Sequence, residues 1–156
     1  NGNVNAAIGQ AVGNYNGSHG LNLTMAGAGG SANLWLDRVT TIGNGTGGAG
    51  SGIQLTETYA GGTFMGGQQI VSANNVGNGV RIVADAAGAL ATDFGGGPDS
   101  LGQSSFYGNG TDFRYNNGAG GSILAQNNWW GTLTPVAGQF AGSITYNPVG
   151  PDPNGP

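Results

Sequence analysis

The sequence predicts an all-β fold, a parallel β-solenoid of about four or five imperfect coils. Three observations favour it: a composition that opposes helix formation, short runs in which apolar and polar residues alternate, and a rough repeat of about 31 residues. The 156 residues fit a single domain. We expect this domain to cover residues 1–147, and the proline-rich residues 148–156 to form an extended tail or linker.

The composition argues against helices. Glycine supplies 35 residues and asparagine is also frequent, whereas lysine is absent. Glycine costs about 1 kcal/mol relative to alanine inside a helix, and asparagine prefers turns because its side chain competes for backbone hydrogen bonds. A glycine-rich chain with few charges is also compatible with disorder, but the short alternating runs of large apolar residues favour a folded chain.

A turn element recurs along the chain. An aliphatic or aromatic residue precedes Gly-Asn-Gly at residues 42–45, 76–79 and 107–110, and a looser copy begins at Val12. These copies lie 30, 34 and 31 residues apart. Glycine and asparagine accept the positive φ angles that tight turns require, so each copy predicts a turn.

A second element, an apolar-polar-apolar triplet, follows each turn, with spacings of 32, 27 and 33 residues. Period-two alternation is typical of a strand with one buried and one exposed face. In a solenoid the polar members would stack in one column on an outer face, where two adjacent arginines would repel each other unless Asp85 or Asp112 lay between them. The triplets are Leu21-Asn22-Leu23, Ile53-Gln54-Leu55, Val80-Arg81-Ile82 and Phe113-Arg114-Tyr115.

We expect a second strand before each turn element, over residues 34–41, 69–73 and 102–106, so that each repeat consists of strand, turn, strand and turn. Asn-Gly is also a strong signal for antiparallel hairpins, which makes an antiparallel β-sandwich the alternative fold. The long repeat favours the solenoid, because sandwich strands turn every ~8–12 residues without such self-similarity. The expected outer loops are the glycine-rich residues 26–31, 46–52, 60–67 and 94–100.

Charge and hydropathy exclude several partners. The net charge is −4 and only Arg38, Arg81 and Arg114 are basic, so we expect neither nucleic-acid binding nor attraction to an anionic membrane. No run approaches the ~18 apolar residues of a membrane span, and the lack of cysteine excludes disulfides and thiolate metal sites. Residues 1–5 lack the pattern of a signal peptide, so we interpret the chain as a mature or excised product.

No catalytic, cofactor-binding or metal-binding residues are predicted. The acids are scattered, whereas polysaccharide lyases and hydrolases need clustered carboxylates. Asp93 and Asp99 flank a Gly-Gly-Gly-Pro run and are near enough in sequence to share a calcium ion, but solvated loop acids are the simpler interpretation. Asp37 beside Arg38 is interpreted as a surface pair, and the lone His19 as a turn residue.

Four Asn-x-Ser/Thr triplets are possible glycosylation acceptors. They would carry glycans only in a source that has the machinery, and such triplets also arise by chance in a chain so rich in asparagine. The four acceptors are Asn16, Asn22, Asn44 and Asn109.

The C-terminal part carries a motif that points to a family. Residues 125–132 read Ala-Gln-Asn-Asn-Trp-Trp-Gly-Thr, and residues 143–148 read Ser-Ile-Thr-Tyr-Asn-Pro. This resembles the closing segment of extracellular right-handed parallel β-helix repeat proteins, in which an Asn-Asn-Trp-Trp-Gly run ends the last regular coil. The resemblance implies a right-handed solenoid, but adhesins, surface-layer-like proteins and carbohydrate-active enzymes all share it, so it implies no single activity.

Trp129 and Trp130 are the possible glycan contacts. Adjacent strand residues point to opposite faces, so one ring should cover the end of the core and the other should lie outside. The outward ring is then available to stack on a glycan.

Without a predicted active site, the ends of the solenoid carry the functional prediction. No amphipathic capping helix precedes the first coil, and an open coil end presents unpaired backbone groups. Head-to-tail contacts between such ends generate filaments. We therefore predict a non-enzymatic secreted structural protein, a homo-oligomer that assembles head-to-tail into an extracellular or cell-surface fibre, sheath or matrix. An adhesin or glycan-binding module of a larger surface protein is the alternative, and a remnant of a carbohydrate-active enzyme comes third.

Overall fold

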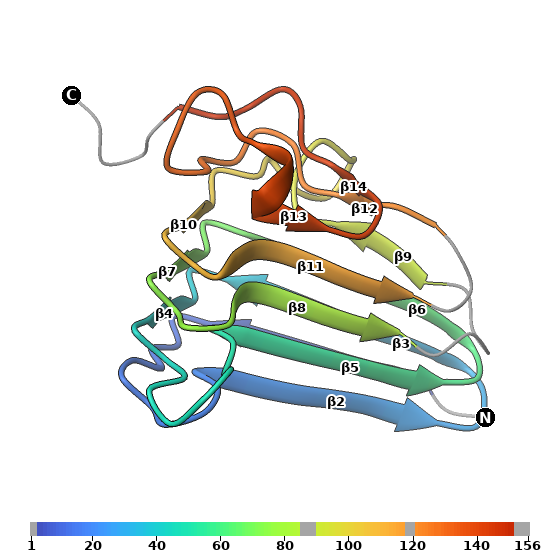
Figure 1. The fold of residues 1–156 in the computed structure, drawn as a ribbon. Coiled ribbons are helices and arrows are strands. Elements are labelled where there is room, and N and C mark those ends of the chain that lie inside the picture. The colour runs from blue at the N-terminus through green and yellow to red at the C-terminus, as the bar shows by residue number, and fades with distance from the viewer. Residues whose placement is uncertain (1–2, 85–89, 118–120, 152–156) are drawn as a thin grey trace.

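The computed structural model describes residues 3–84, 90–117 and 121–151. Within these residues every strand pair is parallel, and the chain forms a solenoid of about four turns (Figure 1). Strands of the front wall run to the right in Figure 1 and those behind run to the left while the chain rises, which makes the solenoid right-handed. The predicted parallel β-solenoid is confirmed, and the antiparallel β-sandwich is excluded.

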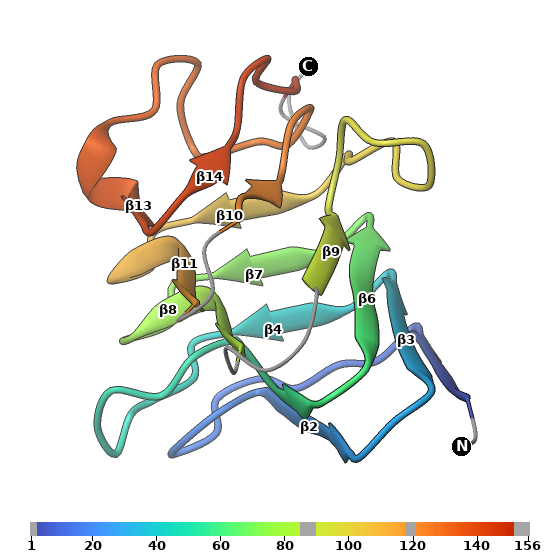
Figure 2. The same ribbon diagram turned by 90° about the vertical axis from the view of Figure 1, so that its right-hand side faces the viewer.

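Three sheets form the walls of the solenoid, and each regular coil passes once through all three (Figure 2). Sheet A contains β1 (Val4–Gly9), β3 (Ser31–Asp37), β6 (Gly62–Gln68) and β9 (Leu90–Asp93). Sheet B contains β4 (Thr40–Ile42), β7 (Val71–Ala73) and β10 (Ser105–Tyr107). Sheet C contains β2 (Leu21–Gly27), β5 (Ile53–Tyr59), β8 (Asn78–Ala84), β11 (Thr111–Asn117) and β13 (Phe140–Ala141).

The four triplets lie side by side in sheet C, in the predicted register. Leu21 is opposite Ile53, Ile53 is opposite Val80, and Val80 is opposite Phe113. The polar residue that follows each of these therefore stacks in a column on the outer face of the sheet, as expected. The column is Asn22, Gln54, Arg81 and Arg114.

The second, third and fourth coils have three strands each, where the sequence predicted two. The expected strand at 34–41 is divided between β3 and β4, and the chain turns between them at Arg38, which has a φ of 52°. In the third coil the additional strand is β6, so the expected outer loop at 60–67 is wrong. Its glycines obscured the strand pattern. They are there because neighbouring groups lie very close: a Cβ on Gly67 would come within 2.7 Å of the Leu36 carbonyl oxygen.

The predicted turn copy at 76–79 is not equivalent to the other copies in the structure. Asn78, in the copy at 76–79, lies in β8 opposite Thr111, whereas the residue equivalent to Asn44 and Asn109 is Asn75. The cause is the residue before it. Asn74 has a φ of 55° and takes the left-handed position that Gly43 and Gly108 fill with φ values of 67°, so this turn contains Asn-Asn in place of Gly-Asn.

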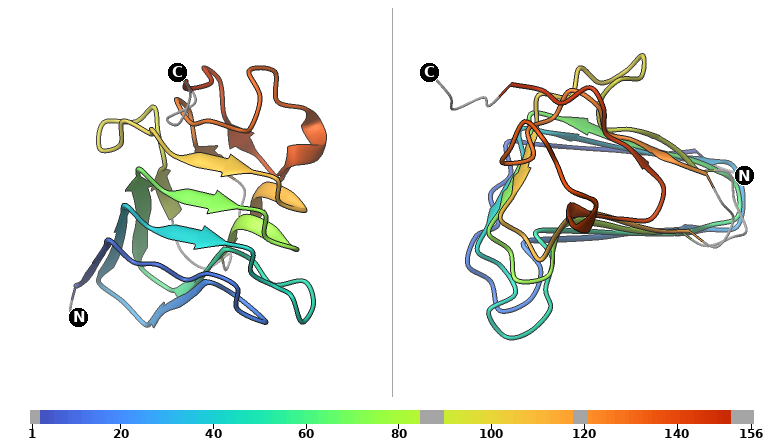
Figure 3. Two further views of the ribbon diagram at one scale, coloured as in Figure 1. Left: turned by 90° about the vertical axis from the view of Figure 1, so that its left-hand side faces the viewer. Right: turned by 45° about the horizontal axis from the view of Figure 1, so that its top comes forward.

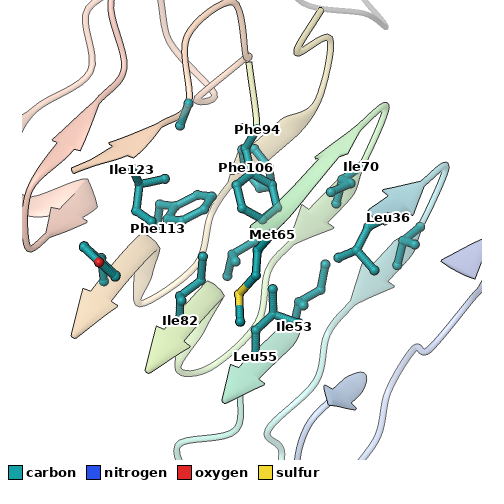
Figure 4. Packing of buried hydrophobic residues seen from close by; sticks show 14 of the residues in the cluster. Leu36, Ile53, Leu55, Met65, Ile70, Ile82, Phe94, Phe106, Phe113 and Ile123 are labelled. Carbon is teal, nitrogen blue, oxygen red and sulfur yellow. The ribbon is translucent and has the colours of Figure 1, made fainter. Parts of the chain in front are cut away.

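The core lies between the three walls and consists of the residues that alternate inward. Figure 4 shows Met65, Ile82 and the large aromatic side chains meeting there. In the upper coils Phe113 packs edge-on against Phe94 and Phe106, with ring centroids 5.4 and 5.5 Å away. Edge-to-face pairs of this kind add to the stability that burial itself provides.

An irregular segment covers the C-terminal end of the solenoid (Figure 3, right). The 3₁₀ helix η1 (Ala137–Gln139) leads into β13, and β14 (Ile144–Thr145) pairs with β12 (Ile123–Leu124). Phe140 stacks on Tyr146 at 4.2 Å and packs edge-on against Trp130 at 4.8 Å.

The packed body extends past residue 147, the expected start of the tail. Asn127 N–H donates to the Pro148 carbonyl at 2.7 Å, and Gly150 N–H donates to the Asn128 carbonyl at 2.9 Å. Val149 packs against the core. The expected boundary therefore lies too early, and residues 152–156 of the expected tail lie outside the described residues.

Candidate functional site

An asparagine ladder runs up the corner between sheets B and C. Asn44 donates from its backbone N–H and from Nδ2 to Oδ1 of Asn75, at 3.0 and 2.9 Å. Asn75 donates in the same way to Oδ1 of Asn109, at 2.9 and 2.8 Å. Asn16 begins the ladder with the equivalent pair to Asn44, at 2.9 and 3.0 Å. One side chain per coil thus satisfies backbone and side-chain donors of the coil below.

The local backbone explains why these side chains point inward. The residue before each asparagine has a φ between 55 and 67°, in the left-handed region. This conformation turns the chain at the corner and directs the next side chain toward the interior, where Asn44 and Asn75 are 0 and 2% exposed. The left-handed residues are Tyr15, Gly43, Asn74 and Gly108.

Asp112 ends the ladder. It accepts from Asn109 N–H at 3.2 Å and Nδ2 at 2.9 Å on one carboxylate oxygen, and from Gln139 Nε2 at 2.7 Å on the other. Burial raises the pKa of the Asp112 carboxyl above its ordinary value of 3.8, although the hydrogen bonds from Gln139 and Asn109 oppose this shift. The ladder therefore ends at the Asp112 carboxylate, which is also hydrogen-bonded by Gln139 of η1.

The raised pKa predicts a pH dependence of stability. The folded protein binds the Asp112 proton more tightly than the unfolded chain, so the contribution of this carboxyl is full below its unfolded pKa and is lost as the pH rises through its folded pKa. We expect the free energy of unfolding of the wild type, relative to Asp112→Asn, to fall as the pH rises from below 3.8 and then to become constant. Urea denaturation of both proteins at stepped pH measures this difference. A difference that rises with pH would contradict the prediction.

The other acids also have structural partners. Both oxygens of Asp93 accept backbone N–H groups of residues 95–100 at 2.8 to 3.2 Å, and its side chain is 1% exposed. The interpretation as a solvated loop acid is wrong for Asp93 and confirmed for the exposed Asp99. Glu57 points into the core and accepts from Tyr59 N–H at 2.5 Å and Thr63 Oγ at 3.3 Å. In the described residues no three acidic or histidine side chains gather at a common metal site.

The two tryptophans of the C-terminal motif lie on opposite sides of the chain, as expected. Trp130 is 1% exposed and packs against Phe106 and Phe113, with ring centroids 5.2 and 6.4 Å away. Trp129 is half-buried, and its backbone pairs with Ser105. Trp130 cannot reach a glycan in this structure, which leaves Trp129 as the glycan candidate of the pair.

The four possible glycosylation acceptors differ in access. Asn22 is exposed on the outer face of sheet C. Asn44 is fully buried and its Nδ2 is held by Asn75 and by the Gly13 carbonyl, so the folded chain has no room for a glycan there. Asn16 and Asn109 also use Nδ2 in the ladder.

The two arginines of the outer column of sheet C do not have the acidic partners that were expected between them. Arg81 and Arg114 lie in register, but Asp112 is turned into the ladder and Asp85 lies outside the described residues. Arg114 Nε instead donates to Asn116 at 3.0 Å. Asp37 and Arg38 form the expected surface pair at 2.6 Å.

His19 is a turn residue, as predicted. Its Nδ1 accepts the Ser51 N–H at 2.9 Å and so joins the turn of the first coil to the corresponding loop of the second.

The N-terminal end of the solenoid is open in the part of the chain that the structure describes. β1 pairs only with β3 and β2 only with β5, so one edge of each strand has no described neighbour. Between the two strands lies a hollow of about 200 Å³ that opens onto the core. Its apolar lining includes Val4, Ala6, Ile8, Leu23, Met25 and Leu34.

Comparison with known proteins identifies no relative of this chain. Neither the family models, nor the curated proteins, nor the solved structures contain a match to the chain. No helix among the described residues has the length and apolar character to cross a membrane. A functional proposal therefore depends on the ladder, the walls and the two ends.

Proposed function

We propose that the protein is a structural β-solenoid subunit that self-associates head-to-tail into an extracellular fibre, sheath or matrix. The observation that supports this most is the open, apolar and uncharged N-terminal end. The proposed occupant of that end is the C-terminal end of a second copy of the chain. The extracellular or cell-surface location is supported by the family resemblance of the C-terminal motif.

The first coil lacks the charged side chains with which edge strands usually avoid pairing. No aspartate, glutamate, lysine or arginine occurs before Asp37, so neither β1 nor β2 carries a charge. Charged side chains on an edge strand normally oppose pairing with another chain. Val4 is 52% exposed at this edge, beside the apolar hollow. Nothing charged would have to be desolvated when a second copy covers this end.

The opposite end offers a complementary surface. Leu133 and Val136, in the segment that covers the last coil, are 73 and 64% exposed. An apolar hollow at one end and exposed apolar side chains at the other form a heterologous contact, which produces an open filament when the rotation between subunits does not close. This arrangement favours head-to-tail contact over contact between two identical ends.

A non-enzymatic role is part of the proposal. The carboxylates of Asp93 and Asp112 are occupied by hydrogen bonds that shape a loop and close the ladder, and Glu57 is buried in the core. A catalytic acid or base must reach substrate. These three side chains are at most 2% exposed, so a substrate cannot reach them.

A lysine placed at either end should weaken assembly, and a mixture of the two variants should form only the contact between their unchanged ends. We expect Val4→Lys and Leu133→Lys each to weaken self-association at least about tenfold, because a buried unpaired charge opposes the contact. The two residues are exposed in the single chain, so the folds should be retained. An equimolar mixture should give dimers that do not grow, since each variant keeps one intact end. Sedimentation velocity and negative-stain microscopy measure these species.

Thr58→Lys is the matched control, because it adds the same charge to an exposed position on β5, a strand of sheet C that is already paired on both sides and lies at neither end. It should assemble like the wild type. A wild type that stays monomeric at high concentration would overturn the proposal. If Leu133→Lys assembled alone while Val4→Lys did not, two N-terminal ends would be in contact and the head-to-tail arrangement would be wrong.

A further inference from the structure

An aromatic pair, Trp35 and Phe64, lies on the outer face of sheet A. Trp35 and Phe64 are half-buried, and both alternate with core residues along β3 and β6, so their rings point away from the core. The rings are parallel within 7°, with centroids 6.4 Å apart. They belong to adjacent coils, so the fold holds them together.

Small residues surround the two rings and fix their position. Trp35 has Ala7 and Gly66 as its neighbours in register, and Phe64 has Ala91 on the coil above. A Cβ on Gly66 would lie 2.7 Å from Trp35 and 2.9 Å from Phe64, so both rings lie against the bare backbone of β6. Rings seated in this way are ordered before any ligand arrives, which lowers the entropy cost of binding.

Hydrogen-bonding groups flank the rings on both sides. On one side Asn33 Nδ2 donates to Asn5 Oδ1 at 2.7 Å, and both residues are exposed, which leaves a donor of Asn5 and an acceptor of Asn33 for a ligand. On the other side Gln68 Nε2 lies 3.4 Å from Asp37 Oδ1. The guanidinium nearest to these groups, Arg38, is paired with Asp37 at 2.6 Å.

We propose that Trp35 and Phe64 form a binding site for a neutral saccharide chain on the outer face of sheet A. Two parallel rings offer apolar faces for the C–H faces of sugar rings, and the amides and the carboxylate at their edges match sugar hydroxyls. An acidic ligand is disfavoured, because the chain has a net charge of −4 and the Arg38 charge is already paired. This function is separate from self-association, since the site lies on a wall and not at an end.

The test measures binding of oligosaccharides of glucose, N-acetylglucosamine, xylose and mannose, with an acidic oligogalacturonate as comparison. Calorimetry uses the Val4→Lys variant, so that the outcome does not depend on assembly. We expect at least one neutral oligosaccharide to bind with a dissociation constant of about 1 mM or below. Trp35→Ala and Phe64→Ala should each weaken that binding about tenfold or more.

Two further variants separate this site from other causes. Gly66→Ala retains both rings but displaces them, so it should also weaken binding. Tyr15→Ala removes a 75% exposed aromatic ring at the corner between sheets B and C and should leave binding unchanged. Circular dichroism confirms that each variant is folded. The proposal is overturned if no neutral oligosaccharide binds, if the acidic one binds more tightly, or if Tyr15→Ala weakens binding as much as Trp35→Ala.

Discussion

Replacing Asn75 by alanine should lower the free energy of unfolding by about 3–5 kcal/mol. The side chain is 2% exposed and lies in the middle of the ladder. Its removal leaves the backbone N–H and Nδ2 of Asn44 without their acceptor. It also removes the donor to the Thr41 carbonyl and to Ser72 Oγ, at 3.2 Å each. A buried polar group that loses its partner costs about 1–3 kcal/mol, and several lose theirs here.

Asn74→Gly is the matched control for this substitution. The preceding residue has the left-handed backbone, and glycine already fills this position in the neighbouring coils, at Gly43 and Gly108. Glycine accepts a φ of 55° without strain, so we expect a change below about 1 kcal/mol. Urea denaturation followed by circular dichroism measures both variants. Equal effects of Asn74→Gly and Asn75→Ala would mean that the ladder contributes little beyond the turn.

The sequence predicts the part of this fold that strict alternation encodes. The triplets at Leu21, Ile53, Val80 and Phe113 lie in register because an inward apolar residue in each coil must meet the one below. The ladder was less predictable. Its turns accept glycine or asparagine at the left-handed position, so Asn74-Asn75 does not match Gly43-Asn44 by letter, although the two are equivalent in space.

The strands of sheet A were the least predictable from the sequence. In β6 one outward position is Gly66 and one inward position is Gly67, and a pair of glycines in sequence is typical of a loop. Only the structure shows that Gly66 lies under the rings of Trp35 and Phe64 and that Gly67 lies against Leu36. The aromatic pair is not evident from the sequence for a related reason: Trp35 lies in the expected strand at 34–41, but Phe64, 29 residues later, lies in the expected loop at 60–67.

Alternation within the C-terminal motif predicts unequal roles for its two tryptophans, and substitution should reveal them. Trp130→Ala should lower the free energy of unfolding by about 3–5 kcal/mol, because the ring is fully buried among Phe106, Phe113 and Phe140. The loss would fall on the segment that covers the last coil, since Phe140 packs edge-on against Trp130 at 4.8 Å. Hydrogen exchange should therefore increase first in β13 and β14.

Trp129→Ala provides the comparison, because it removes the same side chain from the adjacent residue. Trp129 is half-buried and contributes its backbone to the pairing with Ser105, which alanine retains, so the expected loss is about 1 kcal/mol or less. Chemical denaturation of the two variants gives the difference directly. If Trp129→Ala were as destabilising as Trp130→Ala, both rings would belong to the cover of the core. Trp129 would then be removed as a glycan candidate, and Trp35 would be the remaining tryptophan available to a saccharide.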